Sequence, residues 1–194
     1  TGERANRQSS GWGDGVYKST DGGRTWRNMG LRDSHHIGPI ALHPVNASTV
    51  FVAAMGHLWG PNDERGLYKS TDGGATWRRV LQVDSITGVV HVAIDPRNPQ
   101  TMYAASYQRM RKPFGFHGGG PGSALYKSTD GGETWRKIAP LAGGRIPDAA
   151  SRAGGPAAAD TLGAPGPNGL PRGEYGRNGI SMHRAEPRID YGSF

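Results

Sequence analysis

The ten-residue phrase YKSTDGGRTW at residues 17–26 recurs as YKSTDGGATW at 68–77 and as YKSTDGGETW at 126–135. The second copy begins 68 − 17 = 51 residues after the first, and the third begins 126 − 68 = 58 residues after the second. A repeat of this length has room for about four short strands, and such periods are typical of propellers and solenoids. The phrase therefore predicts a protein built from repeated, blade-sized units.

The residue types in the phrase predict a tight turn between two strands. The Asp21 carboxylate can accept N–H groups of its own turn, Gly23 tolerates a positive φ, and the hydroxyls of Ser19 and Thr25 can tie the strand ends together. Trp26 is expected to lie buried between neighbouring sheets with its indole N–H bonded to a carbonyl. We expect the same structural roles in all three copies: Ser19, Asp21, Gly23, Thr25, Trp26, Ser70, Asp72, Gly74, Thr76, Trp77, Ser128, Asp130, Gly132, Thr134 and Trp135.

The pattern S-x-D-x-G-x-T-W, present at residues 19–26, 70–77 and 128–135, resembles the Asp-box or BNR repeat. That repeat occurs in sialidases, in oligoxyloglucan-type glycoside hydrolases, in a photosystem II assembly factor and in sortilin/Vps10-type receptors. The phrases at 53–70 and 115–128 are most similar to large bacterial proteins classed as sortilin/Vps10-like or as BNR-repeat glycosyl hydrolases. The resemblance covers residues 1–141, and 174–194 more weakly. It implies a β-propeller and an extracellular or periplasmic location.

The expected fold class is all-β, with four-stranded antiparallel blades that form about three blades of a larger propeller. Apolar runs predict strands at 37–42 (an inner strand covered on both faces), 49–55, 66–70 and from 76, then at 89–94 and 101–107. Closing a propeller takes at least four blades, so the remaining blades of a parent chain are expected partners. The predicted units are the end of a blade at 1–31, blades at 32–83 and 84–141, a flexible Ala/Gly/Pro-rich insertion at 142–173, and the start of another blade at 174–194.

Composition argues against several functional classes. The net charge is 23 − 16 = +7, but Lys18, Lys69 and Lys127 recur once per repeat and no nucleic-acid motif is present, so nucleic-acid binding is not expected. The chain has no cysteine, and no apolar run approaches the ~20 residues of a membrane span. The histidines match no metal-binding spacing and no cofactor motif is present, so neither a metal nor a cofactor is expected.

Propeller geometry places the repeated turns on one face and the irregular loops at 3–14, 30–36, 56–65, 83–88 and 107–123 on the other. Variable loops on a rigid scaffold commonly carry function, so this loop face is the expected location of a ligand site. Aromatic and cationic side chains suit a peptide or a glycan, and Trp59, Phe114 and Phe116 could act as stacking platforms or pack under the loops. The ligand-binding candidates are His35, His57, Trp59, Arg65, Tyr107, Arg109, Arg111, Phe114, Phe116 and His117.

Three functions remain open on this evidence. The first is a non-catalytic module, similar to sortilin/Vps10 proteins, that binds a peptide or a glycan. The second is a glycoside hydrolase of the BNR type, in which two carboxylates flank the scissile bond; the candidates are Asp33, Asp63, Glu64 and Asp84, and solvated charges are the alternative explanation for them. The third is an assembly scaffold. A pair of acids facing one cleft would favour the enzyme, and an aromatic and cationic rim without them would favour the binding module.

Overall fold

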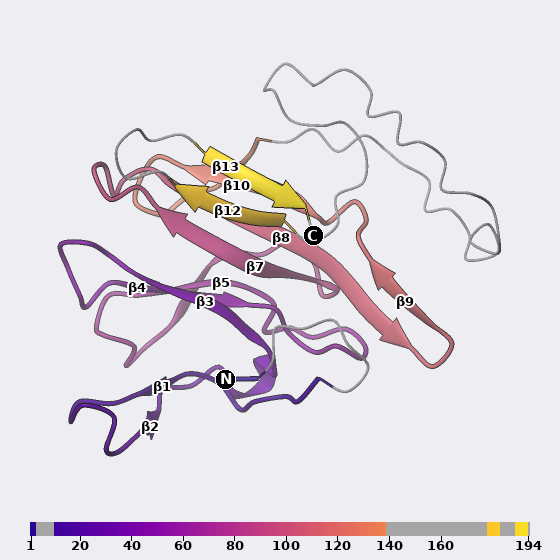
Figure 1. The fold of residues 1–194 in the computed structure, drawn as a ribbon, viewed down its shortest axis with the longest axis horizontal. Helices are drawn as coiled ribbons and strands as arrows, with labels where there is room; N and C mark the ends of the chain where they lie inside the picture. The colour runs from indigo at the N-terminus through magenta and orange to yellow at the C-terminus, as the bar shows by residue number, and fades with distance from the viewer. Residues whose placement is uncertain (3–9, 139–177, 183–188, 194) are drawn as a thin grey trace.

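The computed structural model describes residues 1–2, 10–138, 178–182 and 189–193 of the 194-residue chain. The described residues form strands and one short 3-10 helix, η1 (Figure 1). Their bounds are β1 Tyr17–Lys18, β2 Arg27–Asn28, η1 Arg32–Ser34, β3 Ile37–Leu42, β4 Val50–Ala54, β5 Gly66–Ser70, β6 Arg78–Leu81, β7 Thr87–Ile94, β8 Met102–Lys112, β9 Gly115–Gly118, β10 Ala124–Ser128, β11 Arg136–Lys137, β12 Asn178–Met182 and β13 Ile189–Ser193.

Two antiparallel sheets make up most of this structure. Strands β3, β4, β5 and β6 form one sheet, and β7, β8, β10 and β11 form the next, with hydrogen-bonded neighbours in that order. In both sheets the repeated phrase supplies the third strand and the turn that leads into the fourth. The predicted all-β fold with four-stranded antiparallel blades is thus confirmed.

The first strands of successive units lie side by side. Strand β7 lies against β3 on one side and against β12 on the other, and β12 pairs with β13 (Figure 1). The start of another blade was predicted at 174–194, and β12 lies within that range. The insertion predicted at 142–173 lies outside the described residues.

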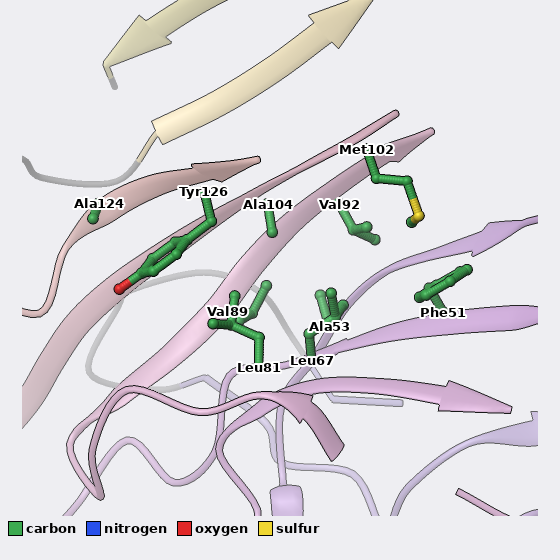
Figure 2. Packing of buried hydrophobic residues seen from close by; sticks show 10 residues of the cluster. All are labelled: Phe51, Ala53, Leu67, Leu81, Val89, Val92, Met102, Ala104, Ala124 and Tyr126. Atoms are coloured by element: carbon green, nitrogen blue, oxygen red, sulfur yellow. The ribbon is translucent and has the colours of Figure 1, made fainter. Parts of the chain in front are cut away.

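The second strand of each blade is buried on both faces. Along β4, Val50, Val52 and Ala54 belong to a cluster shared with the first repeat, whereas Phe51 and Ala53 belong to a cluster shared with the following blade. A strand enclosed by two neighbours needs apolar residues at every position, which explains the unbroken apolar run. Figure 2 shows the second cluster, in which side chains of β4, β5 and β6 meet those of β7, β8 and β10.

Strand β3 differs from the prediction that it is covered on both faces. Ile40 is 48% exposed and Leu42 is 61% exposed. Both side chains line a hollow on the side of the first repeat, where the structure describes only the two short strands β1 and β2. Strand β7 holds the same edge position in the next sheet and is largely buried. The prediction was therefore wrong for this strand.

Part of the segment at 107–123 forms a β-hairpin instead of the expected irregular loop. Strand β8 continues to Lys112, well past the predicted end at residue 107, and the chain returns as β9. Arg109 lies opposite Gly118 and Arg111 opposite Phe116 in this pairing. The hairpin projects beyond the sheet on the side of the irregular loops (Figure 1).

The repeated turns close through the same hydrogen bonds in each copy. In the second copy Ser70 donates to the Asp72 carboxylate at 2.7 Å, and Asp72 accepts from the backbone N–H of Thr76 at 2.9 Å and from its hydroxyl at 2.6 Å. Hydrogen bonds from the threonine of the same turn lower the pKa of Asp21 to about 2 and lower the pKa of Asp72 as well. These aspartates therefore act within their own turns.

The lysines of the first two repeats connect their blades to the turn of the next. Lys18 donates to the Gly73 carbonyl at 2.9 Å, and Lys69 donates to the Gly131 carbonyl at 2.8 Å and to Glu133 at 2.6 Å. These bonds explain why the basic residues recur with the repeat. Lys18 and Lys69 therefore serve blade packing.

The three tryptophans do not share one environment. Trp77 is partly buried against the cluster of the first repeat and donates to the Met29 carbonyl at 2.6 Å, and Trp135 packs on the following interface. Trp26 is 62% exposed and donates to its own Gly23. Trp77 and Trp135 each cover the repeat before them, whereas Trp26 packs against no such repeat among the described residues. The expected burial therefore holds for the second and third copies only.

Candidate functional site

Three irregular segments converge beside the start of β3. They are residues 10–14, the turn at 31–36 that includes η1, and the loop at 56–65 between β4 and β5. Between them lies a hollow of about 210 Å³. Its lining residues are Ser10, Trp12, His35, His36, His57, Leu58 and Trp59.

The turn at 31–36 has an unusual backbone. Leu31 and His35 both have positive φ, at 55° and 56°, although neither is glycine. With ψ at −48° and a hydrogen bond from the His36 N–H to the Ser34 carbonyl at 2.6 Å, His35 forms a γ-turn of the rare type with positive φ. A left-handed conformation costs a non-glycine residue roughly 1–2 kcal/mol. Such strain persists where surrounding contacts enforce it, and it concentrates at functional sites.

Two contacts hold this turn in place. The Gly13 N–H donates to the His35 carbonyl at 2.8 Å. The Trp12 and His35 rings lie 5.1 Å apart between centroids. The first segment therefore fixes His35 from outside, and Trp12 extends over the hollow with 72% of its surface exposed.

Asp33, His35 and His57 meet at one side of the hollow. The His57 Nε2 atom lies 3.1 Å from Asp33 Oδ1, and the rings of His35 and His57 are stacked with centroids 3.7 Å apart. The side chain of Asp33 is 66% exposed and that of His57 is 23% exposed. One carboxylate and two imidazoles from separate loops are thus within reach of the same ligand atom.

Buried residues behind this group hold it in place. Asn62 is 5% exposed and donates to Asp33 Oδ2 at 2.9 Å and to the Asp33 carbonyl at 3.1 Å. Arg65 is 1% exposed and donates to the carbonyl oxygens of Met55 at 2.9 Å and His57 at 2.5 Å. The positions of Asp33 and His57 are therefore set by the interior.

Burial changes the ionisation of several groups here. Desolvation, together with the neighbouring His57, lowers the pKa of His35. Partial burial, and then the charge of Asp33, raises the pKa of Glu64, while the backbone N–H groups of Asp33 and Ser34 act in the opposite direction. Desolvation lowers the pKa of Arg65 to about 10, so its guanidinium stays charged at neutral pH.

The predicted ligand-binding residues fall into three groups. His35, His57 and Trp59 line the hollow. The predicted candidates Arg65, Tyr107 and Arg109 are at most 4% exposed, and Arg109 donates to the Gly56 carbonyl at 3.5 Å. Because these three side chains are buried, they support the loops from within and do not face solvent.

The remaining candidates belong to the β8–β9 hairpin. The Arg111 guanidinium lies 4.9 Å from the centre of the Phe116 ring, and Phe114 is fully exposed at the tip. His117 is also exposed on β9. A β-bridge joins Trp59 to Arg111, and the Arg111 N–H donates to the Leu58 carbonyl at 2.8 Å. The hairpin of one blade therefore supports the loop that carries Trp59 in the blade before it.

The four candidate carboxylates are not equivalent. Asp33 pairs with His57, and Glu64 lies half-buried beside it. Asp63 is exposed, and its carbonyl accepts a hydrogen bond from Arg79. Asp84 accepts the Ile86 N–H at 2.9 Å within its own turn. Asp33 and Glu64 are thus brought together, whereas Asp84 is used by the backbone.

Several residues of this site could not be identified from the sequence. Asn62 and His36 are buried beside the group but match no motif, and Trp12 was only one of several polar and aromatic residues in its loop. The spacing of the histidines gave no indication that His35 and His57 stack. The one useful signal was their placement on neighbouring loops of the irregular face.

No helix in the described ranges has the length and apolarity that a membrane crossing requires.

Known proteins similar to this chain share its propeller elements. The chain is 28% identical over 130 residues to a xyloglucanase of Hypocrea jecorina (strain QM6a) and 30% identical over 134 residues to the xyloglucanase Xgh74A of Acetivibrio thermocellus. These matches cover 66% and 64% of this chain. The crystal structure of an ancestral GH74 enzyme matches with a TM-score of 0.50 at 28% identity over 64% of this chain. The partial propeller predicted from the repeats is thereby confirmed.

The chain spans only a small part of these relatives: 13% of the first xyloglucanase, 14% of the second and 15% of the ancestral enzyme. The family model for sortilin and neurotensin receptor 3, Sortilin-Vps10, matches residues 14–144, which is more than half of the chain. The match begins just before the first repeated phrase and ends just after the third. By this match the chain belongs to the Sortilin-Vps10 family.

Proposed function

We propose that these blades form a non-catalytic module that binds a glycan in the hollow formed by residues 10–14, 31–36 and 56–65. The observation that carries the proposal is the pair of exposed indoles at this hollow, Trp12 at 72% and Trp59 at 48% exposure. Large aromatic surfaces left in water at a concave site with a few polar groups are typical of ligand sites. The imidazoles that line the hollow, with the Asp33 carboxylate beside them, offer hydrogen bonds to hydroxyl groups.

The relatives favour a glycan over a peptide as the ligand. The two curated relatives are named as xyloglucanases, enzymes that act on a polysaccharide. A protein that binds such a polymer would act in an extracellular or periplasmic location. Asp33 is engaged by His57 and Asn62, and Asp84 by its own turn, which supports a binding role. A peptide would be the ligand expected from similarity to sortilin receptors.

A second candidate function is glycoside hydrolysis. It is favoured by the position of Glu64 beside Asp33, because glycosidases use two carboxyl groups of which one has a raised pKa, and burial raises the pKa of Glu64. Reducing-end release from xyloglucan distinguishes the two functions. Release that is lost in both Glu64→Gln and Asp33→Asn would establish the hydrolase, whereas binding without release supports the proposed module.

Calorimetric titration of the full-length protein with a xyloglucan oligosaccharide tests the proposal. Trp59→Ala should weaken binding at least tenfold. Stacking on an indole contributes about 1.4 kcal/mol to the binding free energy, and the loss of that amount lowers the affinity tenfold. Trp26→Ala removes an equally exposed indole from a repeated turn and should leave the affinity unchanged. Equal affinities of the wild type and Trp59→Ala would refute the assignment. If the protein bound peptides but not the oligosaccharide, the ligand of the hollow would be a peptide and not a glycan.

A further inference from the structure

The group formed by Asp33, His35 and His57 has the composition and spacing of a metal site. Each residue offers one ligand atom, and the three atoms lie within 4.8 Å of one another. Tetrahedral coordination with bonds of about 2.1 Å places neighbouring ligand atoms about 3.4 Å apart. The 3.1 Å between Asp33 Oδ1 and His57 Nε2 already falls near that value.

We propose that Asp33, His35 and His57 bind one divalent first-row transition-metal ion at the edge of the hollow. Two imidazole nitrogens and one carboxylate oxygen are suited to Zn²⁺, Mn²⁺ or Fe²⁺, whereas Ca²⁺ and Mg²⁺ prefer oxygen ligands alone. Three protein ligands leave further coordination positions for water or for a ligand oxygen. Those positions would face the hollow that the two histidines line.

The buried residues around the group provide the support that a metal site requires. Asn62 donates to Asp33 Oδ2, so Oδ1 is the oxygen that a metal ion would bind, in place of its 3.1 Å contact with His57 Nε2. Arg65 fixes the backbone of His57 through its carbonyl oxygen. Such partners hold first-shell ligands in the orientation that coordination needs.

The strained turn gives an independent reason to expect a ligand here. The γ-turn at His35 brings its ring against that of His57, and the hydrogen bond from the Gly13 N–H to the His35 carbonyl helps to hold this turn. Stacked rings do not point their nitrogen atoms at a single ion, so metal binding requires one imidazole to rotate about its side-chain bonds. Strain at a non-glycine residue is maintained at sites where the side-chain position matters. A hydrogen bond between His57 and Asp33 alone would not require His35 to adopt it.

The metal proposal shares the imidazoles and the Asp33 carboxylate with the glycan proposal, but the two can be tested separately. Zn²⁺ coordination involves only the three ligand residues, whereas the glycan proposal rests on the indoles. Trp59→Ala should therefore lose glycan affinity and retain Zn²⁺. Either proposal can fail while the other holds, and the two measurements tell which has failed.

The test is a Zn²⁺ titration of the full-length protein, without an affinity histidine tag and after removal of metals by a chelator. A chromophoric chelator that competes for Zn²⁺ reports the affinity. One equivalent should bind tightly, and Asp33→Asn, His35→Gln and His57→Gln should each weaken binding at least tenfold. His117→Gln changes an exposed histidine of the β8–β9 hairpin and should have no effect on this equivalent.

A second measurement on the unmodified protein covers the case of a variant that fails to fold. Imidazole ¹⁵N chemical shifts of His35 and His57 should move on addition of one equivalent of Zn²⁺, while those of His117 stay constant. Absence of a tight equivalent in the wild type, or shifts confined to other histidines, would overturn the proposal. Unchanged affinity in folded ligand variants would overturn it as well.

Discussion

Truncation of Trp77 tests the packing of one repeat on the next, because the chain contains a matched control in the same turn. Trp77 and Trp26 occupy the last position of the repeated phrase, but only Trp77 is packed against the preceding repeat and bonded to the Met29 carbonyl. Replacing a fully buried tryptophan by alanine lowers the free energy of unfolding by about 3–5 kcal/mol. Trp77 is partly buried, so Trp77→Ala should lower the free energy of unfolding by about 3 kcal/mol.

Trp26→Ala should cost less than about 1 kcal/mol, because exposed substitutions have small effects. The assay is urea unfolding of the full-length protein followed by far-ultraviolet circular dichroism, which does not depend on the deleted fluorophore. Similar losses for the two variants would refute the reasoning that each tryptophan stabilises the interface with the repeat before it. A loss confined to Trp26→Ala would refute it more strongly.

Four further outcomes follow from the structure. Lys69→Met should lower the free energy of unfolding in urea by about 1–2 kcal/mol, because it removes charge-assisted hydrogen bonds across the blade interface. Arg78→Met removes the more exposed partner of Glu133 and should lower it by less than about 0.5 kcal/mol. Gly88→Ala would place a Cβ 2.4 Å from the Met55 carbonyl oxygen and should cost about 1–3 kcal/mol by the same assay; a neutral effect would contradict this close approach. Asp63→Asn, on an exposed loop position, should leave the urea midpoint unchanged. Hydrogen bonds from the threonines lower the pKa values of the turn aspartates. The stability that the ionised aspartates contribute is therefore complete above about pH 5 and is lost as the pH falls. A urea midpoint that is constant between pH 5 and pH 2 would contradict this pH dependence.

The repeated phrase made the blades predictable because local and long-range requirements coincide in it. The turn needs aspartate, glycine and threonine for its own hydrogen bonds, and its tryptophan and lysine bind the neighbouring repeat. A short segment therefore records both the hairpin and the packing of successive sheets. The apolar runs at β4 and β8 supplied the core for the same reason, since burial on both faces leaves no polar position.

The candidate site was predictable only as a region. Asp33 and His35 lie on one loop and His57 on another, and the distance between loops depends on irregular backbone such as the γ-turn at His35. Residue type was also misleading for Arg65 and Arg109, since arginine is seldom buried. Both are enclosed because backbone carbonyl oxygens accept their hydrogen bonds.

The hairpin at the end of β8 escaped prediction for a different reason. Residues 115–120 contain four glycines and no apolar alternation, so nothing in that stretch indicates a strand. Pairing with β8 supplies the backbone hydrogen bonds, and Phe116 packs under the Arg111 guanidinium. Tertiary context outweighed local preference here.

Hydrogen–deuterium exchange of the full-length protein, with and without a saturating xyloglucan oligosaccharide, tests most directly whether the irregular loops form the ligand site. The proposed function predicts slower exchange on binding at residues 12–13, 34–36 and 57–60, where the hollow is formed. The repeated turns at 19–25, 70–76 and 128–134 should exchange at the same rate in both states. Protection of those turns, or binding without any change in the three loop segments, would contradict the account.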